Sequence, residues 1–278
     1  MLLATVLALS SAGLHATWNL LIKTSDERDL AAWGQFLAGG ILFAPVLVVT
    51  GFPERDALPW LCLSAFVHVG YVYALVAAYH HGDFSLAYPI ARGGGALAAA
   101  VAGGLLLGDD LPAGAWAALV VVAFALSTLV PRGAPAVEFA YALATAGLIA
   151  TYTVVDTVGA RRTANGFAYG VALTLATGVT LSVAGIARGR GPAFARTIAA
   201  GWRRYALSGL CLTGAYGIVL VAVRLAPVGY VATLRESSVV IGALIGWLLL
   251  GEALGGRRTL SSVVVAAGLV ALVVFTTA

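Results

Sequence analysis

The stretch YVATLRESSVVIGALIGWLLLGE, residues 230–252, decides the class of this protein. Nearly all of its residues are apolar or small, and it is long enough to cross the hydrocarbon core of a bilayer, which takes about 20 residues. Arg235 and Glu236 nevertheless stand in its first half. Even low estimates put the cost of a charged Arg at the centre of such a helix at about 2.5–3.5 kcal/mol. A charged pair there indicates a wet cavity or a buried partner.

The composition of the whole chain agrees with this interpretation. Of 278 residues, 61% are hydrophobic and only 10% are charged, which is too little charge for the surface of a soluble domain. The net charge is +4, and five of the sixteen basic residues lie in the stretch 188–204, which is typical of a cytoplasmic anchor facing anionic lipid. We therefore predict an all-α, multi-pass protein of the cell membrane that is surrounded by the lipid bilayer. We expect no nucleic-acid partner.

Charges and turn residues divide the chain into ten apolar segments with short connections. No soluble domain fits between them. The predicted spans are 2–22, 30–50, 57–79, 84–107, 113–130, 138–158, 165–187, 205–223, 227–250 and 259–277.

The two halves of the chain resemble each other. One register places LLLGDDL (105–111) on LLLGEAL (248–254) and also places Arg92 on Arg235. A second register aligns GLHATWN (13–19) with GLIATYT (147–153). We therefore predict two five-helix repeats, residues 1–131 and 136–278, within one membrane domain.

Two five-span halves joined in series enter the membrane in opposite senses, which gives an inverted repeat with its substrate site near the midplane. Basic residues predict the orientation, because cytoplasmic loops carry an excess of Lys and Arg. Odd-numbered connections hold ten and even-numbered ones four, which places both termini outside. The ten are Lys23, Arg28, Arg132, Arg188, Arg190, Arg196, Arg203, Arg204, Arg257 and Arg258; the four are Arg55, Arg161, Arg162 and Arg224.

Arg92 and Arg235 are the main candidates for binding a solute. Arg stays protonated in proteins, so it cannot lower the cost of burial by losing its proton. Its planar fork suits a carboxylate, phosphate or phosphonate. Two equivalent arginines facing one cavity favour an anion site, and the alternative is a buried Arg–Glu bridge or Arg side chains that reach the headgroups.

Glu236 is a poor partner for Arg235, because adjacent helix residues point about 100° apart. It must pair with another helix, face water, or carry a proton. The last state would suit proton coupling, for which a histidine such as His68 is the other candidate. A bridge that joins two helices is an equal alternative.

Polar and aromatic residues in other spans supply further candidates. His15 and Asn19 lie four apart and share a helix face with much of Trp18, although hydrogen bonding between helices would explain them equally well. Five residues of the third and eighth predicted spans are candidates for lining a cavity: His68, Tyr71, Tyr73, Thr213 and Tyr216.

Several conspicuous residues receive structural interpretations instead. Asp156 lies close to Arg161 and Arg162 and predicts an interfacial ion pair. Asp109 and Glu252 end their helices at equivalent turns. Three glycines, 93–95, predict close backbone approach or local unwinding rather than a phosphate loop, since no strand precedes them.

The pattern resembles the drug/metabolite transporter superfamily, in its ten-span EamA type. The features that carry the resemblance are the paired halves, HATWN (15–19) followed by Lys23, and LLLGE (248–252) mirrored by LLLGD (105–109). YPIARG (88–93) and LRESSVV (234–240) are similar to bacterial members, some of them associated with phosphonate use. The resemblance covers the whole chain.

The resemblance implies ten helices in inverted repeats around a central cavity, with alternating access driven by a proton gradient or by exchange. Many members of the family have both termini in the cytoplasm, which is the reverse of the charge count. The resemblance implies that the cavity is lined by Trp18, Tyr71, Arg92, Tyr152, Tyr216 and Arg235.

We therefore expect a secondary transporter for a small organic solute with an anionic group. The alternative is an exporter of cationic or aromatic compounds that binds them through Glu236. No span offers the clustered acids or the nucleophile with its base that a membrane enzyme would need, so we expect no catalytic residue, metal or cofactor. Glycines at 104 and 108, and at 242 and 246, permit close helix contacts in a monomer or a homodimer.

Overall fold

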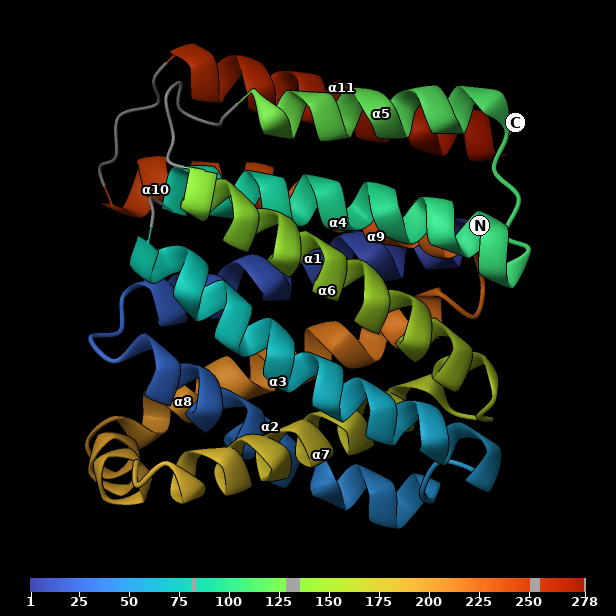
Figure 1. The fold of residues 1–278 in the computed structure, drawn as a ribbon. Helices are drawn as coiled ribbons and strands as arrows, with labels where there is room; N and C mark the ends of the chain where they lie inside the picture. The colour runs from blue at the N-terminus through green and yellow to red at the C-terminus, as the bar shows by residue number, and fades with distance from the viewer. Residues whose placement is uncertain (82–83, 129–135, 251–255, 278) are drawn as a thin grey trace.

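The computed structural model describes residues 1–81, 84–128, 136–250 and 256–277 (Figure 1). The regular structure of these ranges is entirely helical. The helices are α1 (Leu2–Lys23), α2 (Arg28–Thr50), the 3-10 helix η1 (Arg55–Ala57), α3 (Leu58–His81), α4 (Phe84–Leu107), α5 (Ala113–Ser127), α6 (Ala136–Arg161), α7 (Gly166–Ala187), α8 (Gly191–Ala222), α9 (Val228–Leu234), α10 (Ser237–Leu250) and α11 (Gly256–Thr277).

Eight segments within the described ranges are helical, long enough and apolar enough to cross a membrane, and they belong to α1, α2, α3, α4, α6, α7, α8 and α11. The all-helical class expected from the composition is confirmed, and the eight segments are compatible with a multi-pass membrane protein. Helix α5 is apolar but shorter, and the predicted span 227–250 is divided into α9 and α10. The count of ten spans therefore stays a prediction.

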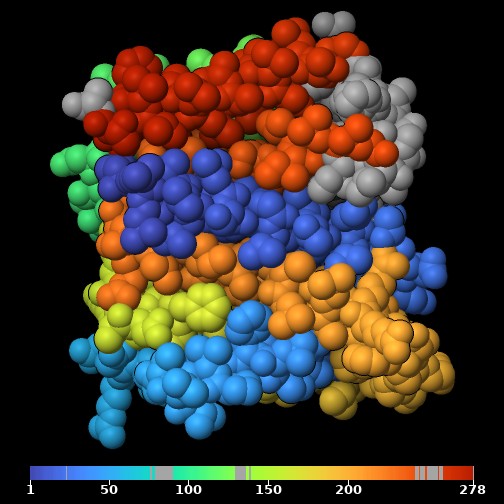
Figure 2. Space-filling model, turned by 180° about the vertical axis from the view of Figure 1, so that it is seen from behind, coloured from blue at the N-terminus to red at the C-terminus, as the bar shows by residue number. Residues whose placement is uncertain are grey.

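The outer surface of the bundle is apolar, as a lipid-facing surface must be. Val48 and Val49 are 87% and 85% exposed, and Leu105 and Phe66 are also exposed. Figure 2 shows one such face, on which α1 lies between α8 and the pair α10 and α11. Large hydrophobic side chains on this scale would be unfavourable in water.

The helices run roughly along one common direction, so the bundle has two ends (Figure 1). Both termini lie at one end, here called the termini end, together with the connections 108–112, 162–165 and 223–227. The connections 24–27 and 188–190 lie at the opposite end. Helices α5 and α11 pack together along one edge of the bundle, and α2 and α7 lie at the other.

Glycine allows helices to approach closely at the points where they cross. A Cβ atom on Gly39 of α2 would lie 2.6 Å from the carbonyl oxygen of Gly209 on α8, and one on Gly209 would lie 2.5 Å from the amide nitrogen of Gly39. A Cβ on Gly95 would lie 2.7 Å from Ile149 of α6. Helix α4 continues unbroken through glycines 93–95, so these residues provide close approach and not unwinding.

Two predicted spans differ from the structure. Helix α8 begins at Gly191, not at 205, and bends at Gly201, where the backbone is not helical. Much of the stretch 188–204 is therefore helix and not loop. The predicted span 227–250 is interrupted at Arg235 and Glu236, which form a turn between α9 and α10.

Candidate functional site

A pocket lies between α1, α2, α3, α6, α8 and the break between α9 and α10. Its walls are mostly apolar and aromatic, with one buried cation. The lining residues are His15, Trp18, Asn19, Ile22, Arg28, Ala32, Gln35, Phe36, His68, Tyr71, Val72, Leu75, Tyr152, Leu212, Ala215, Tyr216 and Arg235.

Helix α1 contributes four side chains to the pocket, His15, Trp18, Asn19 and Ile22. The rings of His15 and Trp18 meet edge to face with their centroids 4.7 Å apart. Asn19 Nδ2 donates to the carbonyl oxygen of His15 at 2.8 Å, one turn back along the same helix. The shared face predicted from the spacing thus lies on the pocket wall.

An aromatic cluster from three helices forms the inner wall. The His68 ring on α3 lies 4.3 Å from that of Tyr152 on α6 and 5.7 Å from that of Tyr216 on α8. Tyr71, one turn from His68, lies 5.3 Å from Tyr152. His68 Nδ1 contacts the Ser64 hydroxyl at 3.1 Å and the Ser64 carbonyl at 3.0 Å, which fixes the orientation of the ring.

Arg235 supplies the buried positive charge of the pocket. It lies in the turn between α9 and α10, and broken helices of this kind form substrate sites in many transporters. Its guanidinium carbon lies 5.7 Å from the centre of the Tyr216 ring. Arg235 is 5% exposed, its Nε has no hydrogen-bond partner, and it makes no ion pair with any residue that the structure describes. A buried guanidinium of this kind can accept an anionic group.

Arg92 pairs with Glu236 and does not share the pocket with Arg235, although both arginines were expected to face one cavity. Arg92 Nη2 lies 2.8 Å from Glu236 Oε1, and Arg92 Nε donates to Oε2 at 3.3 Å. Their side chains are 6% and 3% exposed, and neither lines the pocket. Of the alternatives that the sequence left open, the buried Arg–Glu bridge between helices is the one present. Of the two arginines, Arg235 is the one that lines the pocket, where it is the buried cation and Arg28 is the exposed one.

Asp156 also differs from its prediction. It is completely buried on α6, whereas an interfacial ion pair with Arg161 or Arg162 was expected. The Tyr216 hydroxyl donates to its Oδ2, and Oδ1 has no hydrogen-bond partner in the described part of the chain. The spacing contains a signal for this position, because Asp156 lies four residues after Tyr152 and so shares its helix face.

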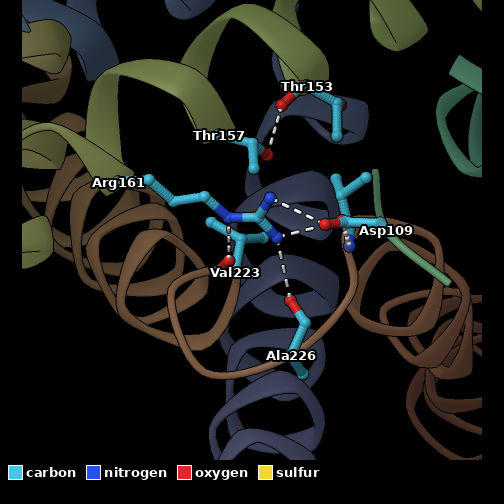
Figure 3. Close-up of polar contacts among 7 residues, drawn as sticks. Asp109, Thr153, Thr157, Arg161, Val223 and Ala226 are labelled. Atoms are coloured by element: carbon cyan, nitrogen blue, oxygen red, sulfur yellow. Dashed lines mark hydrogen bonds and ion pairs between the residues drawn. The ribbon is translucent and has the colours of Figure 1, made fainter. Parts of the chain in front are cut away.

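Arg161 makes several polar contacts at the termini end of the bundle (Figure 3). Its Nη1 and Nη2 donate to the two carboxylate oxygens of Asp109 at 2.7 and 2.9 Å. Its Nε donates to the Val223 carbonyl at 2.9 Å, and Nη2 also donates to the Ala226 carbonyl at 3.3 Å. Asp109 Oδ2 in turn accepts from the amide of Val228, the first residue of α9, at 2.6 Å. These contacts, the Arg161–Asp109 latch, join α4, α6, α8 and α9.

The pocket instead approaches the surface at the opposite end. Ile22, Arg28 and Leu75 line it near the ends of α1, α2 and α3, and Arg28 is exposed. Arg204 of α8 ties this end of α1 through the Leu21 carbonyl at 3.0 Å and the Thr24 hydroxyl. The pocket therefore approaches the surface at the end opposite the Arg161–Asp109 latch.

Some predicted residues lie elsewhere. Tyr73 is 36% exposed, with the Arg188 guanidinium 4.1 Å above its ring, and Thr213 is buried beside Gly39. Neither lines the pocket. Asp109 does end α4 at a turn, where Gly108 has a φ of 67°. Glu252 and the Lys23 side chain lie outside the described residues.

Comparison with known proteins identifies a shared fold but does not identify a family. No family model matches the sequence, and no curated protein matches it. One solved crystal structure superposes with a TM-score of 0.78 and 16% identity, over 97% of this chain and 98% of that one. At this identity the likeness shows a shared fold and carries no information on activity.

Proposed function

We propose that the chain is a secondary transporter of the cell membrane that moves a small organic solute with an anionic group by alternating access. We also propose that it has the ten-span, inverted-repeat organisation of the EamA-type drug/metabolite transporters, which its sequence motifs resemble. The observation that carries the proposal is Arg235, a buried guanidinium that lines an aromatic pocket beside a broken helix.

The charge balance at the centre of the bundle supports an anion. Arg92 is paired with Glu236, whereas Arg235 has no carboxylate partner among the described residues. A carboxylate, phosphonate or phosphate would supply the missing charge through the planar fork of Arg235. The exporter of cations that relies on Glu236 is less well supported, because the carboxylate of Glu236 is already paired with Arg92.

The aromatic walls support an organic solute rather than an inorganic ion. Trp18, Tyr71, Tyr152 and Tyr216 offer ring faces and edges for an apolar or aromatic body, while His15 and Asn19 add polar edges. A few placed polar groups in a largely apolar pocket are typical of small-molecule sites.

The two ends of the bundle support alternating access. The latch links helices at the termini end, and the pocket approaches the surface at the opposite end. On the charge count this opposite end is cytoplasmic, and on the orientation common in the resembling family it is external. In either case transport requires the latch to separate.

Binding of anions to the purified protein in detergent tests the proposal. The panel contains benzoate, benzenesulfonate, phenylphosphonate and the cation tetraphenylphosphonium. A ligand that binds only the folded state stabilises it by about 2.7 kcal/mol at one hundred times its Kd, so the melting temperature rises. We expect stabilisation by at least one of the anions and none by the cation.

The variants Arg235→Ala and Arg203→Ala make a matched pair. Arg203 is exposed and lies outside the pocket, so its loss leaves anion binding unchanged. Arg235→Ala abolishes the stabilisation by anions while the variant remains folded. Equal stabilisation of wild type and Arg235→Ala, or stabilisation by tetraphenylphosphonium alone, would contradict the assignment of Arg235.

A further inference from the structure

Asp156 is a buried carboxyl group that the proposed binding site does not use. It is fully buried on α6, one helical turn from Tyr152 on the pocket wall. Tyr216, another wall residue, donates its hydroxyl hydrogen to Oδ2, and Oδ1 has no hydrogen-bond partner among the described residues. Asp156 therefore contacts the pocket through one hydroxyl group.

The ionisable and charged groups around Asp156 come from every helix near it. Tyr152 lies on its own helix α6, Tyr169 on α7, Tyr216 on α8, and Arg235 in the turn after α9. Helix α3 presents the Ser64 hydroxyl and, one turn further, His68. Helix α4 presents Arg92, which is paired with Glu236. None of these groups forms an ion pair with Asp156, so its charge is not fixed by a bound cation.

We propose that Asp156 is the site that binds the proton which this carrier transports together with its anionic solute. The inference rests on the transport function proposed above. One proton adds to the carboxylate to give the neutral acid, and no other bond forms or breaks. The proton and the anion then cross together with no net charge for each monovalent anion.

Tyr216 couples the two binding events. While Asp156 is a carboxylate, the hydroxyl hydrogen of Tyr216 is directed to Oδ2. A protonated Asp156 is itself a donor, so that hydrogen becomes free to turn towards an anion held by Arg235, which lies over the Tyr216 ring. The anion and the proton also attract each other across the low-dielectric interior. Each therefore strengthens the binding of the other.

Asp156 is better placed for this role than the residues suggested by sequence. Glu236 is paired with Arg92 at 2.8 Å, and His68 Nδ1 contacts both Ser64 oxygens. Along α6, Asp156 lies about 6 Å from Tyr152 and about 7.5 Å from Arg161 at the helical rise of 1.5 Å per residue. It thus lies between the pocket and the Arg161–Asp109 latch, where a proton can reach it first from one end of the bundle and then from the other.

Infrared difference spectroscopy of the protein in lipid vesicles tests the proposal directly. A pH titration over about pH 5 to 9 covers the range in which a buried carboxyl can exchange its proton. We expect the carbonyl band of a protonated carboxyl to appear as the pH falls. The band is absent from Asp156→Asn and unchanged in Asp110→Asn, a matched loss of an exposed carboxylate near the end of α4. A spectrum that Asp156→Asn leaves unchanged overturns the proposal.

Benzenesulfonate then tests coupling, because it stays anionic over this range and any pH dependence belongs to the protein. We expect its Kd to rise by about tenfold per pH unit while Asp156 loses its proton, to a total within the typical coupling of roughly 5–150-fold. At fixed pH its binding increases the carboxyl band. In Asp156→Asn the Kd is independent of pH.

The outcomes separate this inference from the proposed function. Benzenesulfonate that binds through Arg235 without changing the band leaves the anion site intact and overturns proton coupling. Absence of binding to wild type removes the anion site, and the coupling with it. Should Asp156→Asn fail to fold, Tyr216→Phe provides the test, because loss of the hydroxyl group shifts the carboxyl band and weakens the pH dependence. An unshifted band and an unchanged dependence in that variant count against the proposal.

Discussion

The Arg92–Glu236 pair gives the sharpest prediction for stability. The pair is bidentate, with contacts of 2.8 and 3.3 Å, and both side chains are almost fully buried. Glu236→Gln preserves the shape of the side chain and removes its charge. Breaking a buried pair by removing one partner costs about 3–5 kcal/mol, because the other charge stays buried and loses its counter-ion. We expect the upper part of this range, since Arg92 cannot lose its proton.

The reciprocal variant gives the asymmetry that tests this reasoning. Arg92→Gln leaves Glu236 buried, but a carboxylate can take up a proton and become neutral. The loss of stability is therefore smaller than in Glu236→Gln, and the difference from wild type narrows as the pH falls. In the double variant two amides face each other, so its stability lies above that of Glu236→Gln.

Unfolding of the four proteins in the same detergent, followed by tryptophan fluorescence, measures these differences. A free energy of unfolding for Glu236→Gln within about 1 kcal/mol of wild type would mean that water or another anion already compensates Arg92. Ion pairs that contribute so little to stability are typical of solvated sites. An Arg92→Gln variant less stable than Glu236→Gln would refute the argument that proton uptake limits the cost.

Three further predictions concern the rest of the bundle. Gly39→Ala lowers the melting temperature because its Cβ would collide with Gly209, while the matched Gly147→Ala, with no atom within 4 Å, raises or preserves it. Asp109→Asn lowers the free energy of unfolding by about 1 kcal/mol or less, as for other partly exposed pairs. The same change speeds maleimide labelling of a cysteine probe, Thr157→Cys, placed one turn before Arg161. Unchanged labelling would show that the latch is no barrier to the reagent. The Thr163 hydroxyl and the Ala164 amide lower the pKa of Glu54. These contacts therefore stabilise the folded protein above the ordinary pKa of 4.5, and this stabilisation disappears as the pH falls through the lowered pKa. The difference in melting temperature between wild type and Glu54→Gln should shrink below that pH.

Hydropathy and punctuation predict most of the helices closely, for physical reasons that are local. The predicted span 165–187 corresponds to α7, whose start is set by the side chain of Asn165, which accepts from the amides of Phe167 and Ala168. The predicted span 2–22 corresponds to α1 within one residue. Apolar length and a capping residue are properties of the segment itself, so the sequence alone contains them.

The start of α8 and the break after α9 were missed because composition describes polarity and not backbone hydrogen bonding. The stretch 191–200 contains basic and small residues typical of a connection, yet its backbone is helical up to the bend at Gly201. The segment 227–250 is apolar enough for one span, yet its backbone forms a turn at Arg235 and Glu236. Average hydropathy does not indicate either feature.

Helix geometry explains why Asp156 forms no ion pair with Arg161. Arg161 lies five residues further along α6, a rotation of about 500° at 3.6 residues per turn, and so points well away from the Asp156 side chain. Arg161 reaches Asp109 instead, and Asp156 reaches Tyr216. Proximity in sequence suggested an ion pair, whereas the spacing of four from Tyr152 indicated the buried face.

The buried positive charge of the pocket follows from a difference in charged residues between the two halves of the sequence. In the register that equates Arg92 with Arg235, the residue equivalent to Glu236 is Gly93. These equivalent positions thus supply two arginines but one carboxylate, and that carboxylate is bound to Arg92. A second carboxylate at position 93 would be crowded, because a Cβ there already lies 3.1 Å from Leu126. The close packing of α4 against α5 therefore leaves Arg235 without a partner from the equivalent position, and this is the charge that an anionic solute would neutralise.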